Sequence, residues 1–308
     1  MNLSRSAKTF LLAVLALFVV RLLLVIISVP VAAAAPISAI LGIIFVGFPI
    51  LALFLASREP WPRGLAATIL IIGIAMHIFG AVVPLPKLDG VLSAIGQSGL
   101  MLWCCGLGAL LASIINDKNL LVPLSIFLAG FDAFLILNPD SLPRKIMEKS
   151  PGVFTKVAAQ VPSIVQKAPG VTGVAPSAFV GPADFIFLTM FFMALFKFRM
   201  RTSQTLTVMI PVLVAYLFTV VVFGSASIGP MSLSQLPALV PIGLVILLVN
   251  WKEFNLNKQE LASTLVVAVM SVTLASYGFS RAAAARKSMT PESQPVPSKP
   301  VPAPEATK

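Results

Sequence analysis

The chain has 308 residues, of which 58% are hydrophobic and only 11% are charged, and its mean hydropathy of +0.98 excludes an ordinary soluble domain. Its net charge of +11 comes from Lys and Arg in short connections between apolar runs and in the tail, which indicates lipid headgroups and excludes nucleic acid as the partner. The alternating pattern of a membrane β-barrel is absent, so we expect an all-α, polytopic bundle of transmembrane helices, integral to the cell membrane.

The first apolar run, 10–29, begins like a secretory signal, with basic residues before it and small residues at 33–35 that imitate a cleavage site. Arg21 interrupts the run, the run is longer than a signal, and Pro36 would follow the cut. We therefore interpret 10–29 as the first membrane span. Arg21 is expected either to extend its charged head to the interface or to pair with a carboxylate.

Apolar runs of roughly 20 residues, the length of one helical crossing, recur along the chain between residues typical of turns. They predict one domain, 1–280, followed by a Pro-rich tail, 281–308, that we expect to be disordered. Lys and Arg are nearly equal in number on the two sets of alternate connections, so no orientation is predicted. The nine predicted spans are 10–29, 36–56, 65–83, 95–115, 119–138, 176–197, 205–224, 235–250 and 261–279.

The longest internal connection, 139–173, is expected to be a functional or linking loop. Its apolar residues recur at helical spacing, which favours a short helix lying in the membrane interface over part of it. Those residues are Phe154, Val157, Val161, Ile164 and Val165. A linker that simply lies on the surface is the alternative.

Two acidic residues stand apart from the other nine. Of the eleven acids in the chain, only Asp132 and Asp184 lie within apolar runs, in consecutive predicted spans. An acid near the centre of a bilayer costs several kcal/mol. Keeping two of them therefore indicates a shared function.

Spacing along the predicted helices places these two acids at one level. Asp132 lies six residues before Asn138, about 9 Å along a helix, and Asp184 lies eight residues after Pro176, about 12 Å. Consecutive spans run antiparallel. Small residues three positions before each acid, Ala129 and Gly181, are expected to let the two helices pack closely.

Two carboxyl groups in contact at low dielectric cannot both ionise, so they share one proton. Such a pair can hydrolyse a peptide bond, because the ionised member activates a water molecule while the protonated member stabilises the developing oxyanion. Which aspartate takes which role is not predicted, because the pair titrates as a unit.

The residues around both acids resemble the motifs of the presenilin and signal peptide peptidase family of intramembrane aspartyl proteases. Phe131-Asp132 resembles the aromatic-Asp pair of that family, the segment Gly181-Pro182-Ala183-Asp184-Phe185 resembles its Gly-x-Gly-Asp motif, and Pro237-Ala238-Leu239 resembles its Pro-Ala-Leu motif. The order of the motifs matches over about 119–250, the core that would carry catalysis.

The resemblance implies a presenilin-like bundle that cleaves single-span membrane proteins, with Asp132 and Asp184 as the catalytic pair. It further implies that the Pro-Ala-Leu motif borders the pair and positions the substrate. The chain departs from the family at Ala183, which adds a methyl group where the family has glycine, and at Pro182, which stiffens the backbone. Its first motif also lies in the fifth predicted span, where the family has it in the sixth.

Two other functions stay open. A silent, protease-like binding or scaffold protein would explain Ala183. A proton or cation transporter would use the carboxyl pair, with His77, Gln97, Ser125 and Asn250 as further polar residues within spans. Neither a metal nor another cofactor is predicted, since the chain has one histidine and its two cysteines, Cys104 and Cys105, are adjacent in an apolar run.

Overall fold

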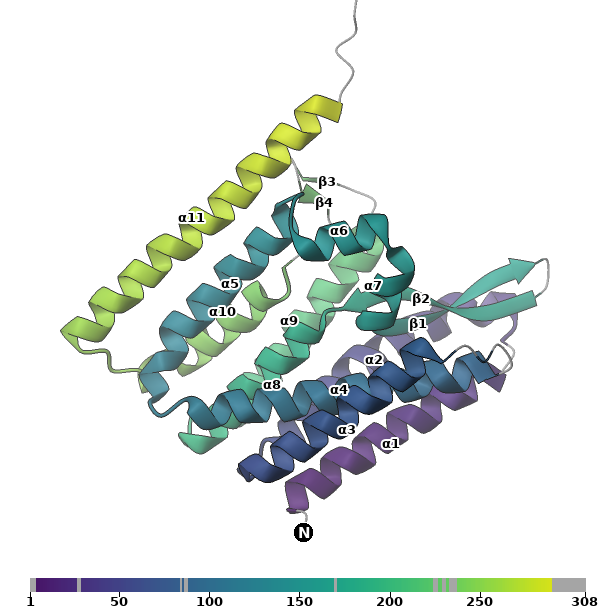
Figure 1. The fold of residues 1–308 in the computed structure, drawn as a ribbon, viewed down its shortest axis with the longest axis horizontal. Coiled ribbons are helices and arrows are strands. Elements are labelled where there is room, and N and C mark those ends of the chain that lie inside the picture. The colour runs from purple at the N-terminus through teal and green to yellow at the C-terminus, as the bar shows by residue number, and fades with distance from the viewer. Residues whose placement is uncertain are drawn as a thin grey trace, which may run out of the picture.

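The structure is a computed structural model that describes residues 4–26, 29–83, 85, 88–168, 171–223, 227–228, 231–232 and 237–289. It is a mostly helical bundle (Figure 1), and each predicted span coincides with a helix over much of its length. These helices are α1 (Arg5–Ile26), α2 (Ala34–Ala56), α3 (Arg63–Val82), α4 (Asp89–Ile114), α5 (Leu121–Leu137), α8 (Pro182–Lys197), α9 (Thr202–Phe223), α10 (Leu239–Asn250) and α11 (Lys258–Met289). Short 3₁₀ turns, η1 (Val31–Ala33), η3 (Lys118–Leu120) and η4 (Trp251–Glu253), adjoin α2, α5 and α10.

Among the described residues, six helical segments are long and apolar enough to cross a membrane: those of α1 to α4 and α11, and the segment Lys118–Ile146 that contains α5. Large apolar side chains stay exposed on their outer surfaces, as Ile71 of α3 and Val266 of α11 do at 66% and 70%. In contrast, α8 has 16 residues and α10 has 12, fewer than the 17 or so that a crossing needs. Helix α8 begins within the motif that contains Asp184, and α10 begins at the last residue of the Pro-Ala-Leu motif.

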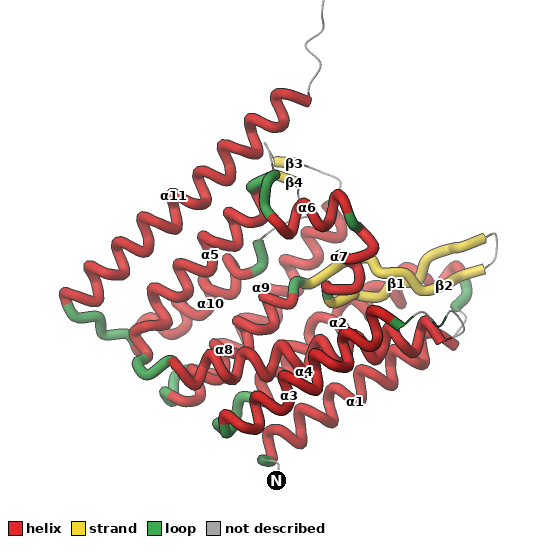
Figure 2. The backbone as a smooth tube through the Cα atoms, in the orientation of Figure 1, coloured by secondary structure: helices red, strands yellow, loops and turns green. Residues whose placement is uncertain are grey.

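The connection between α5 and α8 is the largest departure from the predicted fold. It contains α6 (Leu142–Lys149) and α7 (Pro151–Val157), and then an antiparallel hairpin of β1 (Ala159–Ala168) and β2 (Val171–Val180). Figure 2 shows this hairpin extending beyond the helices on one side of the bundle. A second, minimal pair of strands is β3 (Ser227–Ile228) and β4 (Met231–Ser232).

The predicted short helix is thus confirmed for Phe154 and Val157, which lie in α7, but is wrong for Val161, Ile164 and Val165, which lie in β1. Pro162 removes a backbone donor that a continuing helix would need, and β-branched residues favour a strand. The span predicted to start at 176 is also wrong at its start. Residues up to Val180 pair with β1, and α8 begins only at Pro182, a position where proline suits a first helical turn.

The C-terminal boundary also lies further on than predicted, because α11 continues to Met289. The predicted disordered tail, 281–308, therefore begins within a helix. Residues 290–308 lie outside the described part of the chain, as do Gln235 and Leu236, the start of the predicted span 235–250.

Helices α3 and α4 form the most extensive helix pair of the bundle. Glycines bring the two backbones together, since a Cβ atom added to Gly73 of α3 would lie 2.3 Å from the backbone nitrogen of Trp103. One added to Gly99 of α4 would lie 2.5 Å from the backbone nitrogen of His77. We call this contact the glycine seam; small residues commonly allow such close approach between membrane helices.

Candidate active site

Asp132 lies on α5, five residues before the helix ends at Leu137. Its Oδ2 accepts a hydrogen bond of 2.9 Å from the backbone N–H of Leu239. Leu239 is the first residue of α10, where backbone N–H groups have no partner inside the helix. The structure thus brings Pro237-Ala238-Leu239 against the first aspartate, more than a hundred residues away in sequence.

Asp184 is the third residue of α8 and follows β2 directly. Its Oδ2 accepts a hydrogen bond of 3.1 Å from the backbone N–H of Gly181, and its own N–H donates to the carbonyl of Gly181. This reciprocal arrangement closes the start of the helix, as in a capping box. The acid therefore stands where an extended strand becomes a helix.

The depth predicted for Asp184 needs correction, because α8 starts at Pro182 and the acid lies in the first turn. Asp184 is about 3 Å from the start of its helix and Asp132 about 7.5 Å from the end of its own. Because the two helices run antiparallel, both acids still lie near one level. Both are partly buried.

The two carboxyl groups are close enough to interact electrostatically. The predicted reason for this approach is wrong, since α5 and α8 have no extended contact; α10 packs along α5 and also touches α8. Gly181, one of the two small residues predicted to allow this approach, instead bonds Asp184 of its own helix. Other glycines bring α10 and α11 close to α5. Gly130 of α5 faces Ser271 of α11, and Gly243 of α10 faces Ser125 of α5.

The residues flanking the acids differ in accessibility. Phe131 is 38% exposed and stacks on Phe127 with ring centroids 5.6 Å apart, whereas Phe185 is buried at 4%. Ala183 is exposed and precedes Asp184 directly, while Pro182 is partly buried. The methyl group that distinguishes this chain from the family pattern therefore lies on the accessible side of the acid.

Two residues that the sequence did not single out adjoin the pair. Tyr216 of α9 interacts electrostatically with both carboxyl groups, and Cys104 of α4 lies with its Sγ 3.5 Å from the carbonyl oxygen of Pro182. Both cysteines are buried free thiols. The one available signal for Tyr216 was a lone tyrosine in the apolar run 205–224.

Of the four scattered polar residues of the spans, His77, Gln97 and Asn250 form hydrogen bonds, whereas the buried hydroxyl of Ser125 has no partner among the described residues. His77 Nδ1 lies 2.8 Å from the carbonyl of Gly96, and the Asn250 side chain bonds Thr205, Ile246 and the N–H of Arg201. Gln97 bonds the start of β1. Within the described residues, no group of three His, Cys, Asp or Glu side chains could hold a metal ion.

Comparisons with family models, with curated proteins and with solved structures found no match. The fold and the site define a helical bundle with membrane-length helices in which two acids from apolar helices lie close enough to interact electrostatically. The family resemblance rests on the three motifs and their order.

Proposed function

We propose that the chain is an intramembrane aspartyl endopeptidase of the presenilin and signal peptide peptidase type, embedded in the cell membrane by nine spans. The observation that carries the proposal is that Asp132 and Asp184, the two acids of the apolar runs, lie close enough to interact electrostatically. The Leu239 amide bonded to Asp132 supports it further. No cofactor is needed for this chemistry.

In the proposed reaction, a water molecule lies between one ionised and one protonated aspartate. The ionised carboxylate takes a proton from the water while the water oxygen attacks the peptide carbonyl carbon. The protonated carboxyl transfers its proton to the carbonyl oxygen. The C–N bond then breaks, the nitrogen takes the proton held by the first carboxyl, and a hydroxyl of the intermediate returns a proton to the second. The pair ends in its starting state.

The hairpin suggests how the substrate is presented. A helical substrate shields its scissile bond, whereas an extended segment can add to the free edge of a sheet. The outer edge of β1 lies against α2, where Ile164 N–H donates to Ser38 Oγ over 2.8 Å. The remaining outer edge belongs to β2, which leads directly to Asp184, so we propose that the substrate pairs there.

Ala183 distinguishes an active enzyme from a silent scaffold. Because its side chain is exposed beside Asp184, a larger group should obstruct the substrate: Ala183→Leu is expected to lower the cleavage rate of a reconstituted single-span substrate by about 10- to 100-fold. Ala183→Gly is expected to cleave at least as fast as the native chain. If only Ala183→Gly cleaves, the native chain is the silent scaffold, and an unchanged rate in Ala183→Leu would contradict the proposed approach of the substrate.

Tyr216 is expected to assist the pair. Tyr216→Phe removes only the hydroxyl group and should lower kcat about tenfold with little change in KM, because a polar group near the developing charge is lost. Tyr277→Phe is the matched control, since Tyr277 is 54% exposed on α11. Steady-state cleavage by both variants measures the difference, and equal rates would remove Tyr216 from the site.

A further inference from the structure

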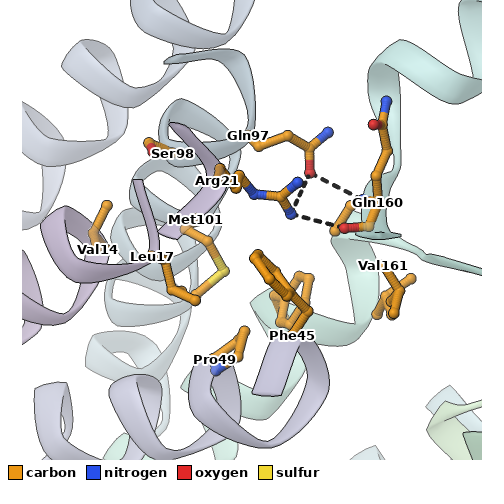
Figure 3. A pocket seen from close by; sticks show the side chains of 13 residues that line it. Val14, Leu17, Arg21, Phe45, Pro49, Gln97, Ser98, Met101, Gln160 and Val161 are labelled. Atoms are coloured by element: carbon orange, nitrogen blue, oxygen red, sulfur yellow. Dashed lines mark hydrogen bonds between the residues drawn. The ribbon is translucent and has the colours of Figure 1, made fainter. Parts of the chain in front are cut away.

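One of the two predictions for Arg21 of α1, pairing with a carboxylate, is wrong for the described residues. Its side chain turns into the bundle, where Nη2 donates to the carbonyl of Gln160 over 2.7 Å and to Gln97 Oε1 over 3.4 Å (Figure 3). The guanidinium also lies 4.6 Å from the ring centroid of Phe45. Among the described residues, no carboxylate forms an ion pair with it.

The guanidinium lines a small cavity between α1, α2, α4 and the root of the hairpin. The cavity has about 20 Å³ of space for a water-sized group, enough for one such group. Neither Nε nor Nη1 of Arg21 bonds an acceptor in the described chain, and the hydroxyl of Ser98, which lines the same cavity and is 6% exposed, also has no partner there. Hydrogen-bond donors without a partner thus line a cavity that has room for a small group.

The charge of Arg21 is not neutralised by its contacts. A carbonyl, an amide oxygen and an aromatic face are neutral partners, and a charge held in apolar surroundings without a counter-charge is costly. The other walls include Leu17, Met101 and Phe185. A water molecule would fill the space but leave the charge without a counter-charge, whereas a small anion would supply one.

We propose that this cavity, which Arg21 and Ser98 line, binds one small monovalent anion of about the size of chloride. The anion would supply the missing counter-charge where α1 and α4 meet the first residues of β1. Gln97 bonds the carbonyl of Ala158 and the N–H of Gln160 at the same place, so occupancy should stabilise the hairpin root. The proposal does not depend on proteolytic activity.

The test is thermal unfolding of the full chain in a neutral detergent, in sodium chloride and in sodium gluconate at equal ionic strength. Gluconate is too large for the cavity. The unfolding midpoint of the native chain is expected to rise with chloride concentration, and this rise should be lost in Arg21→Met but kept in Arg63→Met, which removes an exposed arginine. Equal midpoints in the two salts, or an undiminished rise in Arg21→Met, would overturn the site.

Two further measurements apply if Arg21→Met does not fold. Ser98→Ala is expected to require several-fold more chloride for half of the rise, because one donor is lost. Crystals of the native chain grown in bromide should show an anomalous peak beside the Arg21 guanidinium. A native chain that binds only water there, with no such peak and no shift in Ser98→Ala, contradicts the proposal.

Discussion

Asp132→Asn and Asp184→Asn are each expected to abolish cleavage of a reconstituted single-span substrate, a loss of roughly 10³-fold or more. The reason is that the reaction needs one carboxyl that accepts a proton and one that donates it, and an amide does neither. Because asparagine has the shape of aspartate and keeps an acceptor oxygen, the Leu239 and Gly181 hydrogen bonds can persist. The fold should therefore be retained.

Asp140→Asn is the matched control for both variants. Asp140 lies beyond the end of α5 with its side chain 53% exposed and forms surface ion pairs with Arg281 and Lys145, which contribute little to stability. Its cleavage rate should equal that of the native chain, and size-exclusion profiles and unfolding midpoints should agree among all four proteins. Cleavage that survives in Asp132→Asn or in Asp184→Asn would exclude the protease. The transporter would instead be established if the native chain cleaves nothing but carries ions into liposomes, and if both variants lose this ion flux.

The second large effect concerns stability at the glycine seam. Gly73→Ala and Gly99→Ala are each expected to lower the free energy of unfolding by about 1–3 kcal/mol, the usual cost of overpacking. Each added Cβ would lie within 2.5 Å of a backbone atom of the facing helix, and a backbone cannot move aside as a flexible side chain can. Helices α3 and α4 would have to separate.

Gly42→Ala provides the comparison, because a Cβ at that position of α2 meets no atom within 4 Å. It is expected to be neutral or to stabilise the chain by up to about 1 kcal/mol, since alanine favours a helix over glycine. Unfolding midpoints in one detergent measure all three variants. Equal midpoints for the seam variants and Gly42→Ala would show that the two helices do not pack as closely as described.

Hydropathy located the helices well because apolar length is a property of a continuous segment. A helix satisfies its own backbone groups, so each run of about 20 apolar residues specifies its element without reference to a distant partner. The same reasoning failed over 159–180. A strand is specified by the strand that it pairs with. The sequence around Val161, Pro162 and Ile164 is also compatible with a helix in the membrane interface, and only the pairing with β2 shows that it is a strand.

Within the candidate site, the sequence alone singled out Asp132 and Asp184, because an acid within an apolar run is costly wherever the helix lies. It also placed the two at a similar level. Only the tertiary structure decided how they meet, through α10 rather than by direct packing of α5 on α8. Only the tertiary structure, likewise, brought the Leu239 amide and Tyr216 close to the acids. It also placed Arg21 beside a cavity, without a carboxylate partner among the described residues. Such contacts between distant segments depend on the packing of the whole bundle, which no single segment specifies.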